Sequence, residues 1–252
     1  MVRKERGGDF LYKQHIKNLV QIEQAIKLIQ LDLRRYISTE QVKNEEIYTK
    51  IFSYLVTCWA EVRILKLAYE PNTFTDNEIK EIINASTLKD KWVKALNISV
   101  CKAYNITFSN DKQIITSRLN FTPKTRYLAL INLIENDLMQ SIEIRNRIAH
   151  GQWVYAFTNN LEKISTNLTK ELKTENIVSL QLKIKLFKSL TQIIHDLAVS
   201  PPTFEKNFDM NFNMVEQQIN NLHKRDYNKY KIKMVEKYKR GLNKRRNSKE
   251  TA

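Results

Sequence analysis

The scarcity of glycine and proline is the feature of this sequence that most limits the folds open to it. Only 4 glycines and 4 prolines occur in 252 residues, well below average usage. Sandwiches, barrels and Rossmann folds need many tight turns, so this composition argues against all three. With 42% hydrophobic and 27% charged residues, the chain can bury a core and is not disordered throughout. We therefore predict an all-α fold.

Hydrophobic periodicity predicts a succession of helices in a bundle. Apolar residues recur at steps of three and four, and Thr75, Ser86 or Thr87, and Pro123 occupy favoured helix-start positions. The predicted helices cover residues 9–37, 45–68, 77–84, from 86 or 87 past 100, 123–150 and 176–199, with one or two more from 204 to about 239. Residues 105–123 lack clear periodicity and are predicted to form a loop.

A different pattern follows residue 150. Residues 152–157 and 161–168 are largely apolar with partial alternation, and Asn159-Asn160 lies between them. This arrangement favours a small β-hairpin after Trp153. We expect no strand in the first 120 residues.

We divide the chain into a helical bundle, residues 9–200, and a basic helical C-terminal extension, residues 201–252. The extension is expected to fray after about Lys244 into a disordered end. Within the bundle, Trp59, Leu138 and Ile142 are expected to be buried.

Positive charge gathers in the extension. The chain carries a net charge of +15, and residues 223–252 hold twelve lysines and arginines against three carboxylates, a net +9. Such a segment favours a polyanion, most often nucleic acid. We predict RNA contacts from Lys239, Arg240, Lys244, Arg245 and Arg246. Alternatively the segment is a solvated helix whose tyrosines, at helical spacing from Tyr227 to Tyr238, pack on the body.

Nothing in the sequence points to a metal, a cofactor or a membrane. Cys58 and Cys101 are too few for a disulfide framework or a thiolate metal site, no histidine cluster has zinc spacing, and no glycine-rich phosphate loop exists. The first eight residues have no apolar stretch behind their charges, and the apolar region 51–68 is interrupted by charged residues such as Glu61. We predict a cytoplasmic protein.

Residues 143–151 hold the one group of side chains that indicates chemistry. The apolar row of helix 123–150, Ile131, Ile134, Leu138 and Ile142, continues to Arg145 and Ala149. A guanidinium is costly to bury without a partner, so Arg145 is expected to face a cleft, an interface or an anion site. Asn146 and His150 lie on a neighbouring face, and Gly151 suits the left-handed residue that ends a helix. A phosphate-binding donor beside a titratable acid or base supplies the parts for RNA cleavage.

The pattern Arg145-Asn146-x-x-x-His150 resembles the R-x4-H motif of the HEPN superfamily, which prefers a polar residue after the arginine. The resemblance covers the motif, its place at the end of a long bundle helix, and the helical context of residues 9–200. It implies a homodimer paired through the motif helices. It also implies a metal-independent endoribonuclease in which Arg145, Asn146 and His150 of both protomers are catalytic. Ribonuclease toxins with this pattern often carry a tyrosine two residues after the histidine. Gln152 stands there instead, so regulation by modifying that tyrosine is in doubt.

We accordingly predict an endoribonuclease that cleaves by 2′-hydroxyl attack at a composite dimer site. Arg147 and the basic extension would contact RNA. The resemblance implies a toxin or anti-phage defence effector, with an antitoxin or regulatory partner. Two alternatives stay open, a non-catalytic basic helical RNA- or DNA-binding protein and a scaffold for a partner enzyme. In either of these, Arg145 pairs with a bundle carboxylate or a phosphate, and His150 only ends a helix.

Overall fold

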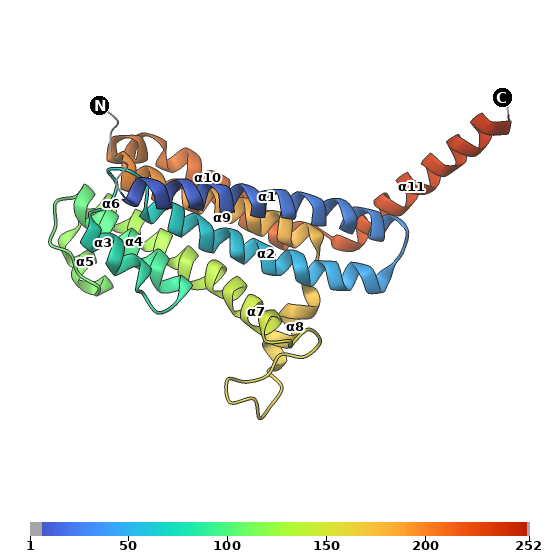
Figure 1. Cartoon of the computed structure of the whole chain (residues 1–252), viewed down its shortest axis with the longest axis horizontal. Coiled ribbons are helices and arrows are strands. Elements are labelled where there is room, and N and C mark those ends of the chain that lie inside the picture. The colour runs from blue at the N-terminus through green and yellow to red at the C-terminus, as the bar shows by residue number, and fades with distance from the viewer. Residues whose placement is uncertain (1–6, 251–252) are drawn as a thin grey trace.

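The computed structural model describes residues 7–250, and this part of the chain is helical without any strand (Figure 1). The all-α prediction is confirmed, as is the absence of strands among the described residues before 120. The helices are α1 (Gly7–Ser38), α2 (Val42–Ala68), α3 (Asp76–Ile83), α4 (Leu88–Ala103), α5 (Lys112–Arg118), α6 (Phe121–Leu133), η1 (Ile134–Leu138), α7 (Met139–Ala149), α8 (Thr166–Thr174), α9 (Ile177–Val199), α10 (Pro201–Lys224) and α11 (Tyr227–Glu250).

Two helix pairs build the body of the molecule. α1 and α2 lie side by side and are joined by a short turn at Glu40, whose φ of 55° is left-handed. α9 and α10 form the second pair, and Pro201 and Pro202 begin α10 directly after Ser200. Proline suits the first turn of a helix because its missing N–H would have no helical partner there. α2 packs against both α7 and α9, so the pairs and the motif region form one bundle (Figure 1).

A single large core joins the helices of the bundle. Its largest fully buried side chains include Phe52, Trp92, Tyr127 and Phe187. The Tyr127 hydroxyl donates to Asn97 Oδ1 at 2.9 Å, which satisfies a buried polar pair. The predicted core positions Trp59, Leu138 and Ile142 are all buried.

The C-terminal helices differ in how they pack. α10 lies along α9 and places Phe204, Phe208 and Val215 in the large core. α11 packs its first half on α1, where Val235 is buried, and then projects beyond the body (Figure 1). The helix continues to Glu250, past the point where fraying was expected, and residues 251–252 lie outside the described residues.

The predicted loop over residues 105–123 is wrong in part, because it contains α5. Asp111 caps this helix by accepting a hydrogen bond from the Gln113 N–H at 2.7 Å, and Ile115 is fully buried. Two turns of helix with one core side chain leave no period to detect in a sequence.

The predicted β-hairpin is also wrong. A single antiparallel bridge joins Phe157 and Ile164, and the chain turns between them at Leu161, where φ is 61°. α8 begins at Thr166, directly after the bridge, so the second strand has no room to extend. We call residues 151–165 the connecting loop.

Candidate active site

The motif residues lie at the end of a helix that contains a π turn. α6, η1 and α7 follow one another without a break, and the five residues of η1 are wound as π-helix. We call the three together the motif helix. A π turn takes in more backbone than an α turn, so it changes the angular position of every side chain that follows.

Arg145 does not continue the core row of the motif helix. The four apolar residues of the predicted row, Ile131, Ile134, Leu138 and Ile142, are buried in the large core. The apolar face then continues through Ile144 and Ile148, which form a small second cluster with Leu172 of α8. Arg145 is only partly buried and Ala149 is exposed. The prediction that the core row extends through Arg145 to Ala149 is therefore wrong.

Arg145 faces α2 and has a carboxylate partner there. Its Nη2 donates to Glu61 Oε2 at 2.8 Å, and the two side chains are 20% and 42% exposed. Arg145 Nε is buried without a hydrogen-bond partner. The guanidinium is thus held in place from one side while part of it stays open to solvent.

Two further polar side chains of α2 share this face. Tyr54, Cys58 and Glu61 follow at steps of four and three, which places them in one row along the helix. Burial raises the pKa of the Cys58 thiol, and the positive charge of Arg145 partly offsets that effect. The neighbouring Cys58 in turn raises the pKa of the Tyr54 hydroxyl. Arg145 therefore lies against a titratable row of α2.

The helix ends as the sequence predicts. Gly151 has a φ of 77°, the Gly151 N–H donates to Ile148 O at 3.1 Å, and the Gln152 N–H donates to Arg147 O at 2.9 Å. This pair of bonds is a Schellman ending, which needs a left-handed residue that glycine adopts without strain. His150 is the C-cap residue. Its side chain and that of Asn146 are both exposed.

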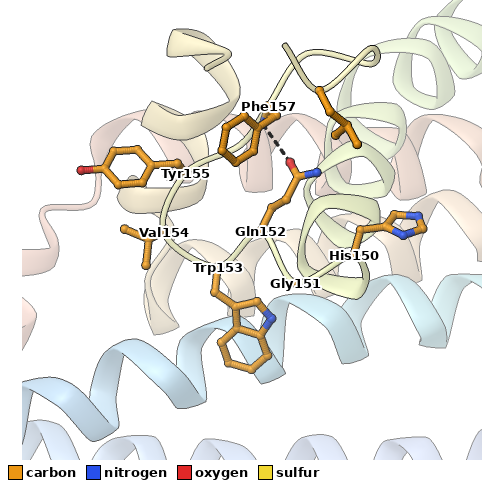
Figure 2. A pocket seen from close by; sticks show the side chains of 8 residues that line it. His150, Gly151, Gln152, Trp153, Val154, Tyr155 and Phe157 are labelled. Carbon is orange, nitrogen blue, oxygen red and sulfur yellow. Dashed lines mark hydrogen bonds between the residues drawn. The ribbon is translucent and has the colours of Figure 1, made fainter. Parts of the chain in front are cut away.

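A hollow of about 560 Å³ lies beside His150. It is lined by His150, Gly151, Gln152, Trp153, Val154, Tyr155, Phe157 and Leu161. Figure 2 shows the His150 imidazole at the end of the motif helix, directed away from Trp153 and Tyr155. One rim of the hollow therefore carries the titratable imidazole, and the other carries aromatic side chains.

Arg147 has a different neighbour from Arg145. Its Nη2 donates to Asn159 Oδ1 at 2.7 Å, and its Nε is buried without a partner. The side chain therefore fixes the connecting loop to the motif helix. Its predicted contact with RNA would have to compete with this bond.

The basic residues of α11 are not brought to the motif. α11 projects from one end of the bundle, whereas α7 and the connecting loop protrude from another side (Figure 1). Lys239 Nζ lies 3.6 Å from Glu40 Oε2 across an exposed ion pair, and Arg245 lines a hollow of about 290 Å³ beside Tyr238. Any RNA contacts of α11 form a surface separate from the motif.

Sequence reasoning missed the α2 side of the site. Glu61 is 84 residues from Arg145, and no local spacing links the two. One signal was present, since Glu61 interrupts an apolar run that otherwise reads as a core helix. A carboxylate in such a position needs a partner.

No three histidine, cysteine, aspartate or glutamate side chains between residues 7 and 250 gather where they could hold a metal ion. None of the helices in the same range combines the length and apolar character that a membrane crossing requires.

Comparisons with protein-family models, with curated proteins and with solved structures find no match to this chain.

Proposed function

We propose that this protein is an endoribonuclease that cleaves RNA by attack of the 2′-hydroxyl, with Arg145, Asn146 and His150 as its catalytic residues. The observation that carries the proposal is the exposed pair Asn146 and His150 at the end of α7. Arg145 directly precedes Asn146 in α7, and His150 is one of the residues that line a hollow. The R-x4-H pattern agrees with this assignment. We place the enzyme in the cytoplasm, as a toxin or defence effector of the kind the resemblance implies.

Each side chain has a role that its chemistry fits. His150 takes the proton from the 2′-hydroxyl or gives one to the leaving 5′-oxygen. Arg145 holds the non-bridging oxygens while negative charge builds on the phosphorane-like transition state. Asn146, one helical turn before His150, orients the imidazole or contacts the phosphate. The bond from 2′-oxygen to phosphorus forms as the bond to the 5′-oxygen breaks, so a cyclic phosphate and a free 5′-hydroxyl result.

One imidazole cannot readily act as both base and acid on opposite sides of the phosphorus. A second protomer would supply the second His150, so we propose a two-fold symmetric homodimer with α7 near the axis. Light scattering should give twice the chain mass at micromolar concentration. A strict monomer with full activity would contradict the composite site.

Two observations favour a second candidate function. Arg145 is already paired with Glu61 at 2.8 Å, and His150 does end a helix. Both features fit a non-catalytic RNA-binding protein or a scaffold for a partner enzyme. In that case the basic surface of α11 would carry the binding.

Cleavage of total RNA in excess EDTA separates the two candidates. We expect the wild-type protein to degrade RNA, and His150→Ala to lose about 10²–10⁴-fold in rate, the usual contribution of general acid–base catalysis. Arg145→Lys should also lose cleavage activity. The lysine ammonium is a point charge and does not replace the planar set of N–H donors of the guanidinium. His223→Ala is the matched control, since His223 is likewise exposed near a helix end. RNA binding without cleavage would support the second candidate, and undiminished cleavage by His150→Ala would overturn the first.

A further inference from the structure

The connecting loop is firmly held, yet it turns apolar side chains outward. Ala156 is buried, its N–H donates to Thr169 Oγ1 at 3.0 Å, and the Ser165 N–H donates to Ala156 O at 2.8 Å. The Phe157 N–H donates to Gln152 Oε1 at 2.8 Å (Figure 2). Against this fixed backbone the exposed large apolar side chains are Trp153, Val154, Tyr155, Leu161 and Ile164. A set of this size on an ordered protrusion indicates a binding surface.

Trp153 is fixed between two hollows. Its indole Nε1–H donates to Ile148 O at the end of α7, at 3.0 Å, while 38% of the residue stays exposed. On one side lies the hollow that reaches His150. On the other lies a hollow of about 500 Å³ that Trp153 shares with Lys50 and Lys173. The indole therefore stands between the titratable imidazole and two lysines.

Tyr155 adds a second aromatic ring with a cation beside it. The residue is 49% exposed, and Lys173 Nζ lies 4.5 Å from the ring centroid. Figure 2 shows the Tyr155 and Trp153 side chains leaving the loop in different directions. Two separate rings are thus presented, each with a lysine ammonium in its neighbourhood.

We propose that Trp153 and Tyr155 form a subsite that stacks unpaired bases of single-stranded RNA next to the scissile phosphate. Every base offers a π-face, so stacking on exposed aromatic rings binds single strands with little sequence preference. Lys173 meets the backbone phosphate between the stacked bases, and the hollow beside His150 receives the adjoining nucleotide. The subsite rests on the proposed function, because it places the RNA at His150.

The charges favour RNA over another protein surface. Lys50 and Lys173 line the second hollow together with the carboxylate Glu46. The Lys50 ammonium donates to Leu172 O and also interacts with the charge of Glu175. The chain as a whole carries +15, which attracts a polyanion at long range. A second copy seated on this loop is the competing occupant, and the experiment below detects it.

The test uses a fluorescent RNA oligonucleotide of roughly ten nucleotides with 2′-O-methyl groups throughout, which removes the nucleophile and leaves the bases. Trp59 and Trp92 are only 3% and 0% exposed, so quenching of tryptophan emission by the oligonucleotide reports on Trp153. Fluorescence anisotropy gives the Kd for the wild type and for Trp153→Leu and Tyr155→Ala. Phe121→Leu is the control, since Phe121 is an exposed aromatic residue at the start of α6, at the opposite end of the motif helix from the connecting loop. Circular dichroism checks that each variant is folded.

We expect quenching in the wild type and a Kd about 5- to 100-fold weaker in Trp153→Leu and Tyr155→Ala, the range that base stacking supports. Phe121→Leu should bind as the wild type does. Unchanged affinity in both folded loop variants would overturn the subsite. Loss of a dimer in Trp153→Leu with unchanged RNA affinity would overturn it in favour of a second copy. Quenching and weakened binding in a protein that never cuts RNA would support the subsite while the catalytic proposal fails.

Discussion

Arg145 is the motif side chain that the bundle itself positions. The ion pair with Glu61 joins two partly exposed side chains, and such pairs contribute about 0–1 kcal/mol to stability. We therefore expect Glu61 to orient the guanidinium of Arg145 and to change the free energy of unfolding very little.

Replacing Glu61 by alanine tests this interpretation. We expect the unfolding free energy to change by about 1 kcal/mol or less, whereas RNA cleavage falls by up to about 10²-fold because the guanidinium is misplaced. Chemical denaturation and initial cleavage rates measure the two effects. Glu81→Ala is the control, because Glu81 pairs with Lys94 at 3.0 Å far from the motif in the sequence. Equal cleavage by Glu61→Ala and wild type would contradict a positioning role.

Glu70 is the second residue whose surroundings lead to a prediction, here of pH-dependent stability. Burial acts to raise the pKa of Glu70, but hydrogen bonds from His195, Lys66 and Tyr12 outweigh it and lower the pKa from 4.5 to about 2. Tyr12 Oη lies 2.9 Å from Oε1, and Lys66 Nζ lies 2.8 Å from Oε2. The carboxylate thereby ties α1, the end of α2 and α9 together.

Because the pKa of Glu70 is lower in the folded protein, its stabilisation is complete above about pH 4.5 and is lost as the pH falls toward 2. Glu70→Gln should unfold at a lower temperature than the wild type at pH 6, and the two melting temperatures should converge on acidification. Thermal unfolding followed by circular dichroism between pH 2 and 7 measures this. A difference that stays constant across that range would show that the charge of Glu70 is not responsible.

At the scale of the element, local sequence signals predicted helix ends well, but they did not predict features that depend on distant residues. Thr75 forms the capping box with Glu78 that a threonine before a helical run predicts, and Gly151 takes the left-handed conformation. The sequence did not predict α5 or the isolated bridge at Phe157, because each is too short to show a hydrophobic period. The contact of Arg145 with Glu61 depends on a partner 84 residues away. No spacing within the motif encodes that partner.

The ending of α7 gives a prediction of its own. A Cβ built on Gly151 meets no atom within 4 Å, so the only strain in Gly151→Ala comes from the φ of 77°. A left-handed conformation costs a non-glycine residue about 1–2 kcal/mol. We expect the free energy of unfolding of Gly151→Ala, measured in urea, to be lower than that of the wild type by this amount. Gly241→Ala, in the middle of α11 with equally open surroundings, should cause no such decrease. An unchanged free energy of unfolding in Gly151→Ala would mean that the end of α7 accommodates alanine without strain.

α11 presents its basic residues on a helix that leaves the bundle. Its first half packs on α1 through Val235, so deleting the helix would also remove core packing. Substituting Arg240, Arg245 and Arg246 by glutamine removes charge alone. Log affinity for single-stranded RNA falls with log salt by about 0.7 per phosphate contacted.

The triple variant should therefore flatten the salt slope by about 2 if all three arginines meet phosphates. Filter binding at several salt concentrations measures the slope. Lys80→Gln, an exposed lysine on α3 at the far end of the molecule (Figure 1), should leave it unchanged. An unaltered slope in the triple variant would leave α11 without a role in RNA binding.

At the scale of the whole molecule, the bundle separates two surfaces that differ in chemistry. The end of the motif helix and the connecting loop carry His150 and exposed aromatic side chains. α11 projects from another part of the molecule (Figure 1), and the segment 223–252 to which it belongs holds +9 of the net charge of +15. A long RNA that touches both would be held by charge along α11 and cut at the motif.

The chemistry of the RNA ends tests the central claim most directly. A defined oligoribonucleotide is incubated with the protein in EDTA, and the fragment ends are identified by mass spectrometry for the wild type beside His150→Ala. We predict 2′,3′-cyclic phosphate and 5′-hydroxyl ends from the wild type, because the ribose 2′-oxygen is the nucleophile, and fragments that form about 10²–10⁴-fold more slowly with His150→Ala. Cleavage that requires magnesium and leaves 5′-phosphates would contradict the account.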